Sequence, residues 1–215
     1  MYVKELWRYP VKSMRGERIS ETEVLVSGIV GDRRIVVTSR HSGWVITARS
    51  HPGLLGLTAL LQDDGSITVN GLPWKSAEVM ELASEAAGER VELRELGTRT
   101  ERFDVLPLLV ATDGAIEELK IDSRRLRPNI IVGGVEGRAE REWPGRKLQM
   151  GEVAIDVAQL RGRCVMTTFD PDTLEQDLNV IRNIVKKMQG KTALDCGVLT
   201  PGHLREGDVV TLWPK

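Results

Sequence analysis

The sequence predicts a β-rich α/β fold, and two observations carry that prediction. Short runs rich in β-branched residues and bounded by turn residues recur along the chain, at 35–38, 45–47, 67–69, 91–93, 130–132, 153–155, 164–169 and 209–212. Stretches with apolar residues at helical spacing are fewer. With 215 residues, the chain can bury a sizeable core as one large domain or as two closely packed smaller ones.

A hairpin and a helix are predicted in the first half of the chain. The run Asp-Asp-Gly at 63–65 is typical of a hairpin turn, because Gly65 supplies the positive φ that a tight turn needs. Apolar residues at helical intervals predict a helix over 76–87. Ser76 can cap its start and Gly88 can end it.

Two further helices are predicted in the second half. One follows Thr112 and Asp113, and the other runs through the apolar positions of 178–188 to a stop at Gly190. We interpret the apolar face of the last helix as core, since a Met and Leu stripe at helical spacing is far more often core than a cofactor site. The predicted domain boundary follows residue 97, giving domains 1–97 and 98–215.

Charge and targeting signals narrow the class of protein. The chain carries 30 Lys and Arg against 31 Asp and Glu, so its composition gives no sign of nucleic acid or an anionic membrane as a partner. The start of the sequence has neither a signal peptide nor an apolar stretch that could span a membrane. We therefore expect a cytoplasmic protein with no membrane anchor.

Several motifs with known chemistry are not found in the sequence. Two cysteines without a C-x-x-C pair do not suggest a disulfide scaffold, and three dispersed histidines argue against a metal site made by protein ligands alone. The run GGVEG at 133–137 fails the G-x-G-x-x-G spacing, and the P-loop, G-x-S-x-G and H-E-x-x-H motifs do not occur.

Cationic and small polar residues instead gather at the ends of predicted strands. They are Lys12 and Ser13, Arg33 after Asp32, Arg49, and Arg127 with Asn129. Each cation alone is more often a solvated surface charge than a ligand contact. For Arg127 we expect an extended backbone, because Pro128 follows it. The helix that starts at Thr112 could receive an anion at its free N–H groups, or Thr112 could simply cap it.

Cys164 raises the sharpest question. A free cysteine at the start of an apolar run is commonly a small buried hydrophobe. Here Arg161 and Arg163 precede it and would favour the thiolate if their side chains lie near, and a thiolate is both a nucleophile and a ligand for soft metals. Cys196 has no polar neighbours of this kind, so we expect it to pack in the core.

Five strings together resemble the MOSC family, named after the C-terminal domain of molybdenum cofactor sulfurase. They are YPVKS (9–13), TAR (47–49), RPNI (127–130), RCVMTTFDPDT (163–173) and REGDVV (205–210), and the string around Cys164 is the most specific. The chain is most similar to the branch that contains the mitochondrial amidoxime reducing component and its bacterial relatives. The resemblance implies a MOSC-type β-barrel packed with an N-terminal β-barrel-like subdomain and a few helices.

The resemblance also implies a molybdenum cofactor, molybdopterin with its metal, held between the two parts. By position in the matching strings, Cys164 is the protein ligand of molybdenum. Residues expected to contact the pterin or its phosphate are Lys12, Ser13, Arg33 and Arg127, with Arg49, Thr112 and Asn129 near the same site.

The activity implied is the two-electron reduction of small N-hydroxylated or N-oxygenated substrates. Electrons would come from an external protein, ferredoxin-like or cytochrome-like with its reductase, because two cysteines cannot hold an iron–sulfur cluster in the chain itself. Asp170, or alternatively Asp172, is a candidate for proton delivery. The alternatives are a carrier that bears the cofactor or a persulfide on Cys164 only in transit, and a structural domain with no cofactor.

Overall fold

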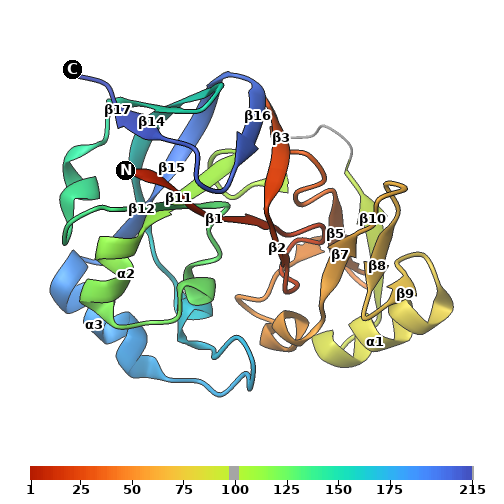
Figure 1. Ribbon diagram of the computed structural model, residues 1–215. Coiled ribbons are helices and arrows are strands. Elements are labelled where there is room, and N and C mark those ends of the chain that lie inside the picture. The colour runs from red at the N-terminus through yellow and green to blue at the C-terminus, as the bar shows by residue number, and fades with distance from the viewer. Residues whose placement is uncertain (97–101, 215) are drawn as a thin grey trace.

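This computed structural model describes residues 1–96 and 102–214, and the chain forms two lobes side by side (Figure 1). The larger lobe is built on an eight-stranded sheet in which β11 and β12 pair in parallel and the other neighbours pair antiparallel. Across this sheet the order is β17 (Val210–Leu212), β13 (Lys147–Met150), β14 (Val153–Gly162), β15 (Lys191–Thr200), β11 (Leu108–Thr112), β12 (Ile130–Gly133), β1 (Tyr2–Arg8) and β2 (Glu17–Ile19).

The two ends of the large sheet approach each other. Tyr2 in β1 forms an isolated bridge with Val209, just before β17 at the opposite edge. The Val3 amide donates to the Asp208 carbonyl at 2.8 Å, and the Gly207 amide donates to the Val3 carbonyl at 2.7 Å. This curvature encloses an apolar core that includes Leu6, Val110, Ile130, Leu148 and Leu194.

The smaller lobe holds a second core beneath two short sheets. One sheet has the order β10 (Val91–Glu95), β5 (Ile35–Ser39) and β6 (Val45–Ile46), and the other the order β7 (Ala59–Leu61), β8 (Ile67–Val69) and β9 (Leu72–Pro73). The helix α1 (Ala77–Ala87) packs Val79 and Ala83 into this core. A third sheet of β16 (Gly202–Arg205), β3 (Glu21–Leu25) and β4 (Gly28–Ile29) joins chain segments from the two halves of the sequence.

The predicted hairpin and helices are confirmed. Residues 63–65 connect β7 to β8, with Gly65 at φ 80°. The Ser76 hydroxyl accepts the Val79 amide at the start of α1, and Gly88 ends this helix in the left-handed conformation. The other helices are α2 (Asp113–Leu119), α3 (Leu178–Met188) and the 3-10 segments η1 (Pro52–Gly56), η3 (Ser123–Leu126), η4 (Ala139–Glu142) and η5 (Val165–Thr168). Among the described residues, no helix has the length and apolar character needed to cross a bilayer.

The strand predicted over 164–169 is wrong. β14 ends at Gly162, and the chain then forms the 3-10 turn η5. The Thr167 hydroxyl donates to the Cys164 carbonyl at 2.9 Å, and the Thr168 hydroxyl donates to the Val165 carbonyl at 2.6 Å. These local bonds compete with strand pairing, so the β-branched run turns instead of extending.

The β-rich prediction is confirmed for the fold as a whole. The predicted domain boundary after residue 97 lies outside the described residues. In space, β1 and β2 from the first fifth of the chain belong to the sheet of the larger lobe. The loop that follows β1 therefore leaves the large sheet and enters the junction between the lobes.

Candidate functional site

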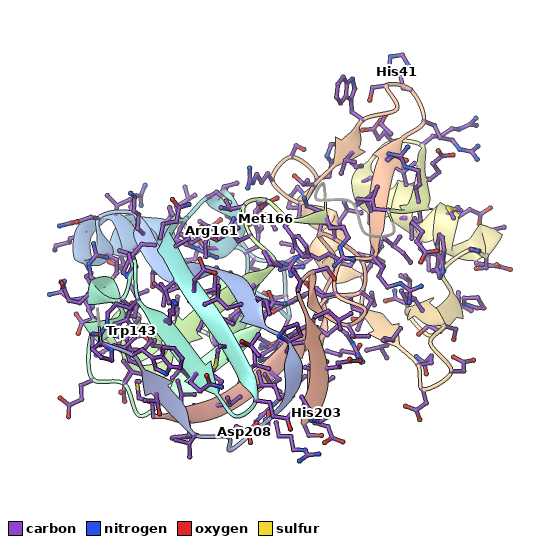
Figure 2. The ribbon with its side chains drawn as sticks, turned by 90° about the horizontal axis from the view of Figure 1, so that it is seen from above. His41, Trp143, Arg161, Met166, His203 and Asp208 are labelled. Atoms are coloured by element: carbon purple, nitrogen blue, oxygen red, sulfur yellow. The ribbon has the colours of Figure 1, made fainter. Side chains whose placement is uncertain are left out.

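A cavity lies at the junction of the two lobes. Figure 2 shows Arg161 and Met166 at this junction, whereas His41 projects from the far tip of the smaller lobe and His203 lies away from both. Several of the residues predicted from the sequence line the cavity, namely Lys12, Ser13, Arg33, Arg49, Arg127, Asn129 and Cys164. Thr112 and Asp170 lie outside its walls.

The loop after β1 supplies Lys12 and Ser13. The Lys12 amide donates to the Ile35 carbonyl at 2.8 Å, which fixes the loop on β5. Ser13 has φ 74°, and its buried hydroxyl accepts the Ala48 amide at 3.0 Å. The backbone bends at Ser13 because the hydroxyl holds this strained conformation against the segment that carries Arg49.

Tyr9 forms a platform for two of the arginines. The guanidinium of Arg127 stands 4.4 Å from the Tyr9 ring centroid, and that of Arg33 stands 5.0 Å from it. Burial raises the pKa of Tyr9 to about 12, although both guanidinium groups oppose this shift. Neutral Tyr9 therefore presents a ring face that attracts both cations.

Asp32 holds Tyr9 and Arg33 in position. Its side chain is fully buried, and one carboxylate oxygen accepts the Tyr9 amide at 2.8 Å. The other oxygen accepts a hydrogen bond from Arg33. The buried carboxylate thereby sets the position of the loop and of one cavity cation at the same time.

Arg127 does not have the extended backbone predicted from Pro128. It adopts the left-handed conformation at φ 54° and ψ 48°, because it closes η3 with its amide bonded to the Arg124 carbonyl at 3.0 Å. The Arg127 guanidinium donates to the Met14 carbonyl at 2.7 Å. Burial lowers the pKa of Arg127 to about 10, so a negative charge beside it would be strongly stabilised.

Asn129 is a buried crosslink at the cavity wall. Its side-chain oxygen accepts the Leu109 amide at 3.1 Å and an Arg33 N–H at 3.3 Å. Its side-chain nitrogen donates to the Trp7 carbonyl at 3.4 Å. Asn129 therefore joins β1 to β11 and helps to hold Arg33 toward the cavity.

Cys164 follows the end of β14 after one residue, Arg163, and lines the cavity together with Gly162 and Arg163. Arg163 donates from its guanidinium to the Leu126 carbonyl at 2.7 Å. Its Nε is buried and has no hydrogen-bond partner within the described part of the chain. Burial lowers the pKa of Arg163 to about 10, and the neighbouring Arg161 lowers it further. A guanidinium in this condition would be stabilised by an anion beside it.

Asp104 is the acidic side chain among the described residues that line the cavity. Its carboxylate lies 3.0 Å from Lys12 Nζ, 2.9 Å from an Arg49 nitrogen and 3.9 Å from an Arg161 nitrogen. Burial alone would raise the pKa of Asp104, but these three cations hold it below its ordinary value. The carboxylate links Lys12 and Arg49 of the smaller lobe to Arg161 at the end of β14.

We expect the free energy of unfolding of Asp104→Asn to fall less than that of wild type as the pH is lowered. A carboxyl whose pKa is lowered by folding stabilises the fold above its unfolded value of about 3.9, and this contribution is lost as the pH falls through the lower folded value. Urea unfolding at several pH values should show a smaller loss of stability below about pH 4 in the variant. Asp63→Asn, in the exposed hairpin, is the matched control. If wild type and Asp104→Asn lost the same free energy of unfolding below about pH 4, the stabilisation of ionised Asp104 by its three cations would be contradicted.

Thr112 caps a helix instead of facing the cavity. It is fully buried, and its hydroxyl accepts the Ala115 amide at 3.3 Å at the start of α2. The same hydroxyl donates to the buried Glu140 at 3.2 Å, and burial raises the pKa of that carboxyl. Of the two readings of this helix start, capping is the one that the structure shows.

Asp170 borders a second cavity, with walls that include Trp7, Tyr9 and Phe169. Its carboxylate accepts the Asp172 and Thr173 amides at 2.9 and 3.0 Å, and these bonds hold the pKa of Asp170 below its usual value. An ionised carboxylate has no proton to deliver near neutrality, so the geometry gives that hypothesis no support.

Arg125 is a site residue that the sequence did not single out. It lines both cavities, and its guanidinium donates to the Asp170 carboxylate at 2.8 Å and to the Thr168 carbonyl at 3.0 Å. Asp104 was also missed, since it follows no motif or periodic segment. Asp170 thus acts on the main cavity by positioning Arg125.

The charges that line the cavity do not balance. Carboxylates compensate some of the cations, since Asp32 pairs with Arg33, Asp195 with Arg161 at 2.6 Å, and Asp104 with three cations. Arg127 and Arg163 donate to main-chain carbonyls instead. Among the described residues no carboxylate forms an ion pair with either, although Asp32 and Asp104 attract Arg127, and Asp195 attracts Arg163, from a greater distance. The cavity therefore suits an anionic ligand next to the thiol of Cys164.

Comparison with known proteins agrees with this geometry. Residues 1–115 match the MOSC N-terminal beta barrel domain, and residues 108–211 match the MOSC domain. The human mitochondrial amidoxime-reducing component 1 is 26% identical over 98% of this chain and 82% of its own length. The human mitochondrial amidoxime reducing component 2 is 26% identical over 80% of this chain and 67% of its own length.

A solved structure shares the fold. The YUAD protein from Bacillus subtilis superposes with a TM-score of 0.53 over 98% of this chain and 94% of its own, at 12% sequence identity. The matched domains cover the lobes and the cavity between them. From its sequence, its fold and the residues of its cavity, the chain belongs to the MOSC family, in which its relatives include the amidoxime-reducing components.

Proposed function

We propose that this protein is a molybdenum-cofactor-dependent oxidoreductase that reduces N-hydroxylated substrates with electrons from an external donor. The observation that carries the proposal is the meeting of one thiol, Cys164, with an excess of guanidinium groups in a single cavity. The names of the amidoxime-reducing relatives support the class of substrate.

The residues of the cavity fit this cofactor. A molybdenum cofactor brings an anionic phosphate and its own sulfur ligands, and it needs from the protein a soft ligand and hydrogen-bond donors. The unpartnered Nε of Arg163 and the depressed pKa of Arg127 both mark donors that an anion would satisfy. Cys164 supplies the soft ligand.

Each side chain then has a defined task. Lys12, Ser13, Arg33 and Arg127 would hold the phosphate and pterin by charge-assisted hydrogen bonds, and Arg49 and Asn129 would complete the same wall. Cys164 would hold the metal through its sulfur, beside Arg163 in the same wall. When bound, the cofactor would supply a metal that exchanges two electrons and takes an oxygen atom from the substrate.

The overall reaction requires an electron source beyond the substrate. Cleaving the N–O bond of an N-hydroxylated compound consumes two electrons and two protons and releases the reduced compound and water. The cysteines of the chain, Cys164 and Cys196, lie at different places, the cavity and the apolar core. We propose a separate electron-carrier protein as the donor.

A direct assay tests the proposal. The protein, produced in a host that makes the cofactor, is mixed with benzamidoxime and reduced methyl viologen, and benzamidine is measured by chromatography. We expect turnover that depends on the protein and retention of the cofactor through purification. Weak retention together with transfer of the cofactor to an acceptor protein would favour the carrier function instead.

A further inference from the structure

The C-terminal end of α3 carries a concentration of positive charge on the outside of the larger lobe, away from α1 (Figure 1). Arg182 and Lys186 lie one turn apart and are exposed, so they share one face of the helix. We define the α3 basic patch as Arg138, Arg141, Arg182, Lys186, Lys187 and Lys191.

The arginines of the neighbouring segment are held against the end of this helix. Arg138 donates to the Lys187 carbonyl at 2.7 Å, and Arg141 donates to the carbonyls of Met188 at 3.0 Å and Lys191 at 3.1 Å. These bonds satisfy carbonyls at the helix end and fix two guanidinium groups there. The patch is therefore a built surface and not a set of independent side chains.

The six cations outnumber the carboxylates around them. Glu118 lies 3.9 Å from the Lys187 ammonium, Glu136 and Glu142 are exposed in the segment that carries Arg138 and Arg141, and the carboxyl of Glu140 is buried against Thr112. The whole chain has a formal net charge of -1, so the positive patch is a local feature and not a consequence of a basic composition. A surface of this kind attracts an acidic partner and raises its rate of association.

Apolar side chains are exposed within the same helix. Val185 is 57% exposed and lies next to Lys186, and Leu178 is 46% exposed at the start of α3. Small apolar contacts surrounded by charged side chains are typical of the interfaces that proteins form transiently.

A short path of covalent bonds and one hydrogen bond joins the α3 basic patch to Cys164. The Arg163 amide donates to the Gly190 carbonyl at 2.9 Å, and Gly190 lies between α3 and Lys191 in the patch. Arg163 is covalently joined to Cys164, and η5 packs on α3. Since electrons tunnel more readily through bonds than through space, this is a short route from the surface to the cysteine. None of the patch residues lines the main cavity as the structure describes it.

From this arrangement we infer that the α3 basic patch is the docking surface for an acidic electron-carrier protein. The inference rests on the proposed function and names the surface and the charge of its partner. Each encounter moves one electron from the reduced carrier, which leaves oxidised. Two encounters supply the two electrons that, with two protons from solvent, convert the N-hydroxyl group to N–H and water.

Charge reversal tests the inference. In Arg182→Glu/Lys186→Glu, binding of a plant-type [2Fe–2S] ferredoxin and of a flavodoxin, both acidic, is measured by calorimetry at low salt on the full chain. We expect at least about tenfold weaker binding than in wild type, and a shallower dependence on salt. Turnover driven by the reduced ferredoxin should fall in parallel, whereas turnover driven by reduced methyl viologen should stay unchanged.

The matched control is Arg40→Glu/Lys75→Glu, which changes the net charge equally on exposed residues of the smaller lobe. Equal weakening in both variants, or no binding of either carrier to wild type, would overturn the inference. So would binding to phosphatidylserine vesicles that the α3 variant loses while neither carrier binds. Failure of the methyl viologen reaction in wild type would instead count against the proposed function.

Discussion

Replacing Cys164 with alanine is expected to lower the rate of amidoxime reduction by at least about a thousandfold, since even partners that only support a metal ligand cost 10- to 100-fold when removed. The side chain lies in the cavity with Arg163, and it is the thiol among the described residues that line this cavity. The measurement is benzamidine formation with reduced methyl viologen.

The second cysteine provides the control. Cys196 is fully buried in the core of the large sheet, and burial raises the pKa of its thiol well above the ordinary value. This confirms the prediction that it packs in the core. Cys196→Ala should cost about 1 kcal/mol of stability and leave turnover within about a factor of two. A Cys164→Ala protein that matched this control in turnover would contradict the role assigned to Cys164.

Replacing Asp32 with alanine is expected to lower the free energy of unfolding by about 3 kcal/mol. The change leaves the buried Tyr9 amide without its acceptor and Arg33 without its buried partner. Both lie in the platform beneath the cavity, so anion binding should weaken together with stability. Urea unfolding at neutral pH measures the loss.

One further variant separates charge from hydrogen bonding at this position, and a second serves as a surface control. Asp32→Asn keeps an oxygen for the Tyr9 amide and should lose less stability than the alanine variant. Asp63→Ala, in the exposed turn between β7 and β8, should stay within about 0.5 kcal/mol of wild type. If Asp32→Ala proved as stable as Asp63→Ala, the buried carboxylate would not anchor the loop as we describe.

Local signals explain which parts of the fold could be predicted. The start and end of α1 follow from Ser76 and Gly88 alone, because a cap and a left-handed glycine act within a few residues. β11 is buried at each of its positions, so its sequence has no alternation to reveal a strand. The run after Cys164 was misassigned because its threonines bond to nearby carbonyls, which a count of β-branched residues does not detect.

The site residues also fall into those that local sequence could predict and those that it could not. Lys12, Arg127 and Cys164 lie in recognisable strings, and Arg33 follows Asp32 at the start of a predicted strand. The fold brings all four to one cavity. Asp104 could not be found in this way, since its importance arises from three cations that distant parts of the chain bring to it. The conformation of Arg127 was missed because closure of η3 outweighs the usual effect of a following proline.

The central claim is that the cavity holds a molybdenum cofactor with Cys164 as its protein ligand. It is tested most directly by the molybdenum and pterin content of wild type and Cys164→Ala, both produced in a host that makes the cofactor. We expect close to one molybdenum atom for each wild-type chain, and loss of the metal or a changed metal spectrum in the variant. Wild-type protein that held neither metal nor pterin after reconstitution would contradict the account.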